Sequence, residues 1–302
     1  MDETFWRGIR VSHPRDWEIV FASSHGHPGK CSFADRRYER LRVQWREMKG
    51  TMNFRKLLED EVGKKREEGK RAEVLTGQAE GWHGVIERTG QGNLVHAGKV
   101  FAGDELYVEA TFIWPGRRDR NLENAILEGT GPGRSPGRWQ AMGMRVQAPA
   151  GLELLRYSSD VGQTAWEFGP SPGSKGLSLT VKRLAVPRYW LKVPLARWLE
   201  AGVGVGAKIV EQKPLRMNGH EAAMVLSRRG PAGAWDKVRG RKLMTLEVAW
   251  KCPVEERVYH LVCCDTVKAG HLSLPGGLRL ECCQEAPLQA KERDEETAKA
   301  AR

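Results

Sequence analysis

The segment GIRVSHP at residues 8–14 recurs as GMRVQAP at residues 143–149, and this recurrence decides the fold that the sequence predicts. The glycine, arginine, valine and proline keep their positions in both segments. Further along, RLRVQWR at 40–46 resembles GLSLTVK at 176–182, and both alternate apolar and polar residues as half-buried strands do. Self-similarity at this distance indicates two copies of one structural unit.

The composition between and after the copies sets the predicted domain boundaries. The segment GTGPGRSPGR is rich in glycine and proline, which continue neither a helix nor a central strand, so it is interpreted as a linker. The end of the chain is polar, charged and rich in alanine. We therefore predict a first repeat at 1–128, a linker at 129–138, a second repeat at 139–283 and a charged tail at 284–302.

Strand patterns dominate each copy, and one or two helical patterns interrupt them. Asn53 is a suitable N-cap for an amphipathic helix that follows it, and Pro194 suits the first turn of a helix in the second copy. The glycine run AGVGVGAK at 201–208 follows that second helix, so it is interpreted as a helix stop and not as a phosphate loop. The predicted fold class is α+β, with two tandem copies of an antiparallel β-sheet packed with one or two helices.

This order of elements, with a G(I/M)RV opening, a helix after the third strand and an NGH turn before a strand meander, resembles the PsbP-like superfamily. That superfamily includes the photosystem extrinsic subunit P, Ran-binding Mog proteins and DcrB-like bacterial proteins. The resemblance covers residues 6–127 and again 139–283. It implies a binding or assembly protein without a shared catalytic centre, and it supplies no site residues.

The totals limit the class of protein further. The 302 residues contain no apolar run long enough for a secretory signal or a membrane span, so we expect a cytoplasmic protein without a span. Six cysteines in a chain of this length favour free thiols over a disulfide framework. The net charge of +11, with its excess in the second half, favours acidic partners. No cofactor is predicted, and no motif of a hydrolase, phosphate loop or zinc protease occurs.

Two Cys-Cys pairs occur in VYHLVCCDTVKAGHLSLPGGLRLECC, residues 258–283. Adjacent residues of a strand point to opposite faces, so both cysteines of a pair can bind one ion only if the strand breaks there. The favoured interpretation is that one cysteine of each pair is a buried apolar residue. A cross-strand pair, bonded or binding metal with His260 or His271, stays open. Cys252, at a predicted hairpin turn, is expected to lie apart. Candidate metal ligands are Cys263, Cys264, Cys282, Cys283 and His260.

The insertion RRGPAGAWDKVRGRK at 228–242 concentrates positive charge around one tryptophan. Such a hairpin can grip an acidic protein surface with Trp235 as an anchor, or contact phosphates and stack a base on that ring; alternatively the tryptophan packs back on the sheet. The predicted function is a non-enzymatic binding or assembly protein that contacts an acidic protein partner through the second domain. The alternatives are a nucleic-acid-binding module and a metal-binding protein or enzyme centred on the C-terminal cysteines. Predicted partner-binding residues are Arg228, Arg229, Trp235, Lys237, Arg239, Arg241 and Lys242.

Overall fold

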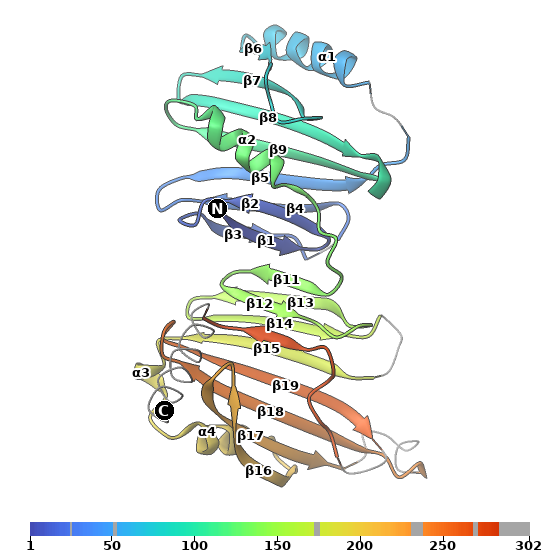
Figure 1. Cartoon of the computed structure of the whole chain (residues 1–302), viewed down its shortest axis with the longest axis vertical. Helices are drawn as coiled ribbons and strands as arrows, with labels where there is room; N and C mark the ends of the chain where they lie inside the picture. The colour runs from blue at the N-terminus through green and yellow to red at the C-terminus, as the bar shows by residue number, and fades with distance from the viewer. Residues whose placement is uncertain (25, 51–52, 172–175, 231–237, 268–270, 284–302) are drawn as a thin grey trace, which may run out of the picture. The chain divides into compact units, whose positions relative to one another are not determined.

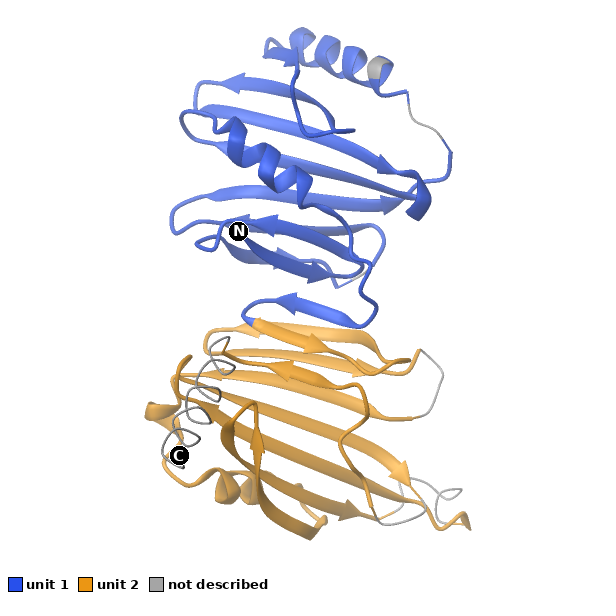
Figure 2. Cartoon of the chain, in the orientation of Figure 1, with its two compact units in different colours: residues 1–143 blue, residues 144–302 orange. Residues whose placement is uncertain are grey.

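The computed structural model describes residues 1–302 except 25, 51–52, 172–175, 231–237, 268–270 and 284–302. The chain forms two compact units, residues 1–143 and residues 144–302, which are described separately (Figure 2). Trp235, Lys237 and the predicted tail therefore lie outside the described residues. Residues 129–138, predicted as a linker, belong to the first unit and include a short strand.

Unit 1 is built on a seven-stranded antiparallel sheet (Figure 1). The strands lie in the order β3 (Glu18–Ala22), β4 (Gly29–Ala34), β5 (Glu39–Glu47), β9 (Leu106–Trp114), β8 (Gly92–Phe101), β7 (His83–Thr89) and β6 (Arg71–Val74). A second group has the order β10 (Gly131–Pro132), β2 (Ile9–His13), β1 (Asp2–Trp6) and β11 (Arg138–Ala141). The helices are α1 (Phe54–Glu67), the 3-10 helix η1 (Ala102–Asp104) and α2 (Arg120–Glu128).

The apolar residues of the strand predicted at residues 40–46 lie in the core of unit 1. Leu41, Val43 and Trp45 of β5 are fully buried, whereas Arg46 and Glu47 at the end of the strand are exposed. Burial of such a face is the main driving force for folding a sheet of this kind. The strand assignment from period-two alternation is therefore confirmed for this segment.

His13, at the end of β2, is buried, and its hydrogen bonds fit the neutral imidazole. Its Nδ1 lies 2.9 Å from the carbonyl oxygen of Pro14, which can only accept, so Nδ1 carries the proton and Nε2 accepts from the Thr4 hydroxyl at 3.0 Å. The ring also packs on Phe33, with 4.7 Å between ring centroids. Burial lowers the pKa of His13 below its ordinary value of 6.5 because it disfavours the imidazolium form.

Acidification should therefore weaken unit 1 through His13. Below pH 6.5 the imidazole is protonated in the unfolded chain, whereas the buried imidazole of the native chain stays neutral to a lower pH. The free energy of unfolding should therefore fall as the pH falls, by up to about 1.4 kcal/mol per pH unit. The measurement is urea unfolding of wild type and His13→Gln at several pH values between 7 and 5. We expect a flatter pH dependence in His13→Gln, and identical curves for the two proteins would contradict this role.

Unit 2 is built on a second seven-stranded antiparallel sheet. Its order is β13 (Glu153–Asp160), β14 (Gln163–Gly169), β15 (Ser178–Ala185), β19 (Arg257–Val267), β18 (Lys242–Cys252), β17 (His220–Arg229) and β16 (Lys208–Met217). Two further strands, β12 (Met144–Gln147) and β20 (Arg279–Glu281), pair with each other. The helices are α3 (Pro187–Trp190) and α4 (Leu195–Gly202).

The helix α4 covers one face of this sheet. Its Leu199 packs with Ala223 and Val225 of β17 and Ala249 of β18. Because strand residues alternate between faces, the even-numbered residues of β17 and β18 point to the face away from α4. Leu246, Val248 and Trp250 are fully buried on that opposite face. Both faces of the central strands of unit 2 are thus covered.

The predicted fold class is wrong. The structure is mostly antiparallel β, with 52% strand and 14% helix. The two seven-stranded sheets share their order of strands, but the helices differ: α1 has 14 residues, α3 has four, and no described helix of unit 2 corresponds to α2. A helix signal in the sequence shows where a helix can begin. It does not show how much of the chain is helical, because that depends on how much of each sheet face other strands already cover.

The helix signals themselves are placed correctly or within one residue. The Asn53 side chain accepts a hydrogen bond from the backbone N–H of Lys56 at 3.2 Å, so the predicted N-cap of α1 is confirmed. Pro194 is the residue before α4 instead of lying in its first turn. The glycine run does end α4 and leads into β16, as predicted. None of the described helices has the length and apolar composition needed to cross a bilayer.

Candidate functional site

The described cations of the predicted insertion gather at one end of the large sheet of unit 2. Arg228 and Arg229 are the last residues of β17, and they pair with Met244 and Leu243 of β18. Lys242 begins β18, and Arg239 and Arg241 lie in the connection between the two strands. Lys208 of β16 lies opposite Arg228, a neighbour that only the strand register reveals. The cationic end is defined here as Lys208, Arg228, Arg229, Arg239, Arg241 and Lys242.

The six side chains of the cationic end have no ion-pair partner among the described residues, although Arg183, Arg197 and Lys213 elsewhere in unit 2 each pair with a glutamate. Asp265, on the strand next to β18, accepts a hydrogen bond from the backbone N–H of Thr266. All six cations are exposed or half-buried, so their field extends into solvent.

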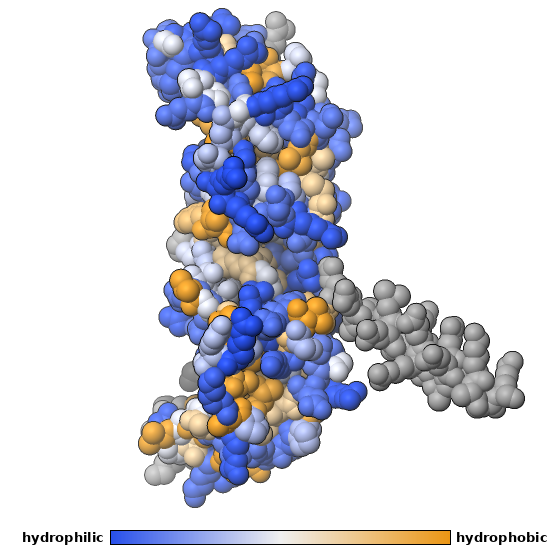
Figure 3. Space-filling model, turned by 90° about the vertical axis from the view of Figure 1, so that its left-hand side faces the viewer, coloured by the Kyte–Doolittle hydropathy of each residue, from blue (hydrophilic) through white to orange (hydrophobic). Residues whose placement is uncertain are grey.

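Among the described residues of unit 2, the exposed aromatic side chains lie away from the cationic end. Tyr189 and Trp190, 66% and 37% exposed, follow β15, whose residue Ala185 pairs with Arg257 at the opposite end of the sheet. On the face drawn in Figure 3, hydrophobic side chains form separate small patches among hydrophilic ones. Among the described residues, the cationic end therefore offers cations without an aromatic stacking platform.

Cys263, Cys264 and His260 do not join the other candidate ligands. Cys263 is fully buried in β19, opposite Leu246 of β18, and burial raises its thiol pKa to about 12. Cys264 points to the other face, where its thiol lies 3.6 Å from the Thr245 hydroxyl. His260 places Nε2 2.9 Å from a carboxylate oxygen of Glu247 and packs edge-on against Trp198. The favoured interpretation of this first pair, in which one cysteine is a buried apolar residue, agrees with these contacts.

The second cysteine pair lies in a cluster that the sequence did not indicate. The thiols of Cys282 and Cys283 gather with the thiol of Cys252 and the imidazole of His220, and the four ligand atoms all lie within 4.8 Å of one another. His220 Nε2 is 3.3 Å from Cys283 Sγ. Cys252 and Cys282 are buried, and His220 and Cys283 are half-buried. The expectation that Cys252 lies apart is wrong, because a hairpin end and the segment after β20 meet there.

Two tight turns bring the first two members of this cluster together. Asn218 and Gly219 join β16 to β17 with φ of 52° and 78°, the left-handed conformations of a two-residue hairpin turn. His220 follows directly. The register of β17 and β18, in which Ala222 pairs with Trp250, places His220 opposite Cys252 at the start of the next turn. Paired residues point to the same face, so both side chains face away from α4.

The end of β20 brings Cys282 and Cys283 into the cluster. The strand ends at Glu281, so Cys282 and Cys283 lie outside it and are free of the alternation that would separate their side chains. The Asn218 side-chain amide donates to the Leu280 carbonyl at 2.6 Å and to Cys282 Sγ at 3.6 Å. The Asn-Gly turn can be read from the sequence, but the end of β20 before Cys282 and the proximity of the four ligands come from the tertiary structure.

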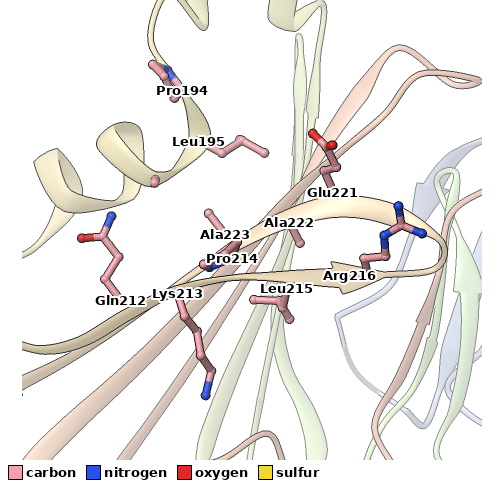
Figure 4. A pocket seen from close by; sticks show the side chains of 11 residues that line it. Pro194, Leu195, Gln212, Lys213, Pro214, Leu215, Arg216, Glu221, Ala222 and Ala223 are labelled. Atoms are coloured by element: carbon pink, nitrogen blue, oxygen red, sulfur yellow. The ribbon is translucent and has the colours of Figure 1, made fainter.

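A groove of about 970 Å³ opens between α4 and the β16–β17 hairpin (Figure 4). Apolar side chains of Leu195, Pro214 and Ala223 line it, and Arg216 and Glu221 lie near the hairpin turn. Because β16 is the last strand of its sheet, Pro214 and the charged residues around it protect an open edge against further strand pairing. The groove lining is thus explained by edge protection and packing of α4.

No protein-family model and no curated protein matches the sequence. Among solved structures, the Ran-binding protein Mog1p of Saccharomyces cerevisiae is similar at 10% identity, over 41% of this chain and 72% of that chain, with a TM-score of 0.27. The immunity protein TplEi of the T6SS from Pseudomonas aeruginosa is similar at 10% identity over 96% and 92%, with a TM-score of 0.32. Similarities at this level carry no argument about fold or function, so the PsbP-like resemblance stays a hypothesis.

Proposed function

We propose that the chain is a non-enzymatic binding protein and that the cationic end of unit 2 contacts an acidic surface of a protein partner. The observation that carries the proposal is the group of six cations at one sheet end with no ion-pair partner among the described residues. Unpaired cations that face solvent attract an acidic partner and speed its encounter, and they lose no internal contact on binding.

Nucleic acid is the alternative partner for the same cations. Single-stranded nucleic acid is usually bound by cations together with aromatic rings on which bases stack. The exposed aromatic residues described in unit 2, Tyr189 and Trp190, lie at the other end of the sheet, and Trp235 of the insertion lies outside the described residues. The experiment below therefore tests a protein-like polyanion and nucleic acid on the same variants.

The test compares fluorescently labelled oligoglutamate with single-stranded and duplex oligonucleotides of equal charge, by fluorescence anisotropy at several salt concentrations. Arg228→Glu combined with Arg229→Glu should weaken oligoglutamate binding about tenfold or more, equivalent to about 1.4 kcal/mol. The matched control is Lys192→Glu combined with Lys251→Glu, which makes the same change in net charge at exposed positions. That control should bind as wild type does.

Two outcomes would contradict the proposal. If the control pair weakens binding as much as the Arg228 and Arg229 pair, the attraction comes from net charge and not from the cationic end. If the oligonucleotides bind more tightly than oligoglutamate, with log-log salt slopes near 0.7 to 0.9 per phosphate contact, the site serves nucleic acid instead. Thermal unfolding of each variant shows whether unit 2 is still folded.

A further inference from the structure

We propose that His220, Cys252, Cys282 and Cys283 bind one Zn²⁺ ion in a tetrahedral site closed by four protein ligands. The site lies at the end of β17 and β18 opposite to the cationic end. It is independent of the proposed function, because the two ends share no residue.

The distances fit such a site. Zinc bonds of about 2.3 Å to sulfur and about 2.0–2.1 Å to nitrogen place tetrahedral ligand atoms roughly 3.5–3.8 Å apart. The four ligand atoms already lie within 4.8 Å of one another, and His220 Nε2 and Cys283 Sγ are 3.3 Å apart. Small side-chain rotations complete the tetrahedron, so the backbone has already brought the ligands together.

The packing of the three thiols favours a bound cation. Cys252 and Cys282 are buried and Cys283 is half-buried, and their sulfur atoms lie within 4.8 Å of one another. Three adjacent thiolates repel one another, whereas a divalent cation at their centre offsets both the repulsion and the burial cost. The cluster therefore suits thiolates only with a metal bound among them.

Hydrogen-bond donors are in place around the sulfur atoms. The Asn218 amide donates to Cys282 Sγ, and the backbone N–H of Glu255 bonds the Cys252 sulfur. N–H donors to coordinating sulfur orient the ligands and stabilise their negative charge, as outer-shell contacts of metal sites commonly do. Two of the three sulfur ligands are thus oriented from outside the cluster.

The ligand set selects the metal and its role. Thiolate and imidazole ligands favour zinc over magnesium or calcium, which take oxygen ligands. Four protein ligands leave no open position for substrate, and this is the pattern of a structural site. The ion would fasten the segment after β20 to the ends of the β16–β17 and β18–β19 hairpins, which lie far from that segment in the sequence.

The experiment measures metal in the full chain, purified without chelator and with Zn²⁺ supplied, by elemental analysis. We expect one zinc per chain, and replacement by Co²⁺ should give the visible absorption of tetrahedral thiolate-bound cobalt. His220→Ala and Cys283→Ser should lose the metal. His220→Cys should restore it, because a fourth thiolate completes the same tetrahedron. Cys264→Ser, at a half-buried thiol outside the cluster, is the matched control and should keep the metal.

A second measurement needs no substitution. Bound zinc should protect Cys252, Cys282 and Cys283 of the wild-type chain from alkylation, and chelation should remove that protection; Cys264 should react equally in both states. Absence of zinc and cobalt binding in the wild type would overturn the proposal. So would a disulfide between Cys252 and either Cys282 or Cys283, detected by mass spectrometry of the unreduced chain.

Discussion

Replacing Glu123 with alanine should lower the free energy of unfolding of unit 1 by about 3–5 kcal/mol, the usual cost of removing one partner from a buried ion pair. Glu123 is 1% exposed in the first turn of α2. One carboxylate oxygen accepts from the Trp114 indole N–H at 2.7 Å, and both oxygens accept from the Arg118 guanidinium at 2.8 Å. Alanine would leave a buried indole N–H and a half-buried guanidinium without this acceptor.

The position of Glu123 explains why one residue has so large an effect. Asp119 caps α2 by accepting from the backbone N–H of Leu122 at 3.0 Å, and the carboxylate of Glu123 also lies near the positive end of that helix. Trp114 ends β9, so the Glu123 side chain joins helix and sheet. A substitution of Glu123 therefore weakens the contact between α2 and β9, and its effect is larger than the loss of a surface ion pair.

The measurement is urea unfolding, with hydrogen exchange of α2 and β9 to assign the loss to unit 1. Glu123→Gln should lose less than Glu123→Ala, because its amide oxygen can still accept from Trp114. Glu128→Ala, at an exposed position of the same helix, is the control and should change stability by less than about 0.5 kcal/mol. A loss below about 1 kcal/mol in Glu123→Ala, or an equal loss in the control, would show that the buried pair does not hold α2.

Removing zinc should destabilise unit 2 and leave unit 1 unchanged. This expectation rests on the proposed site of His220, Cys252, Cys282 and Cys283. A metal that binds only the folded chain stabilises it by about 4 kcal/mol when free Zn²⁺ is about a thousand times its dissociation constant. Chelation should therefore speed hydrogen exchange in β17, β18 and β20, while β5 and β9 of unit 1 exchange as before.

The two units of one chain serve as each other's control in this measurement. If chelation accelerates exchange in both units equally, the chelator acts on the chain in general and the local effect is refuted. If zinc binds in one equivalent but exchange in unit 2 does not change, the site exists without a structural role. Cys264→Ser should show the same difference between the zinc-bound and chelated states as wild type, since its thiol contacts Thr245 outside the cluster.

Local features of the fold could be predicted where a short segment contains its own physical cause. The alternation of Leu41, Val43 and Trp45 predicts a strand with one buried face, and Asn53 predicts the start of α1. The fold class could not be predicted in this way. Whether a sheet face is covered by helices or by other strands depends on segments that are far apart in the sequence, and the structure is mostly antiparallel β instead of the predicted α+β.

The sequence by itself determined that Cys263 and Cys264 point to opposite faces of a strand, and that Asn218 and Gly219 form a tight turn. Both follow from backbone geometry within a few residues. Only the tertiary structure decided that His220 and Cys252 meet Cys282 and Cys283, and that Lys208 joins Arg228. The strand register and the position at which β20 ends set these contacts. Both depend on which residues are buried across the whole unit, and a local sequence pattern does not contain that information.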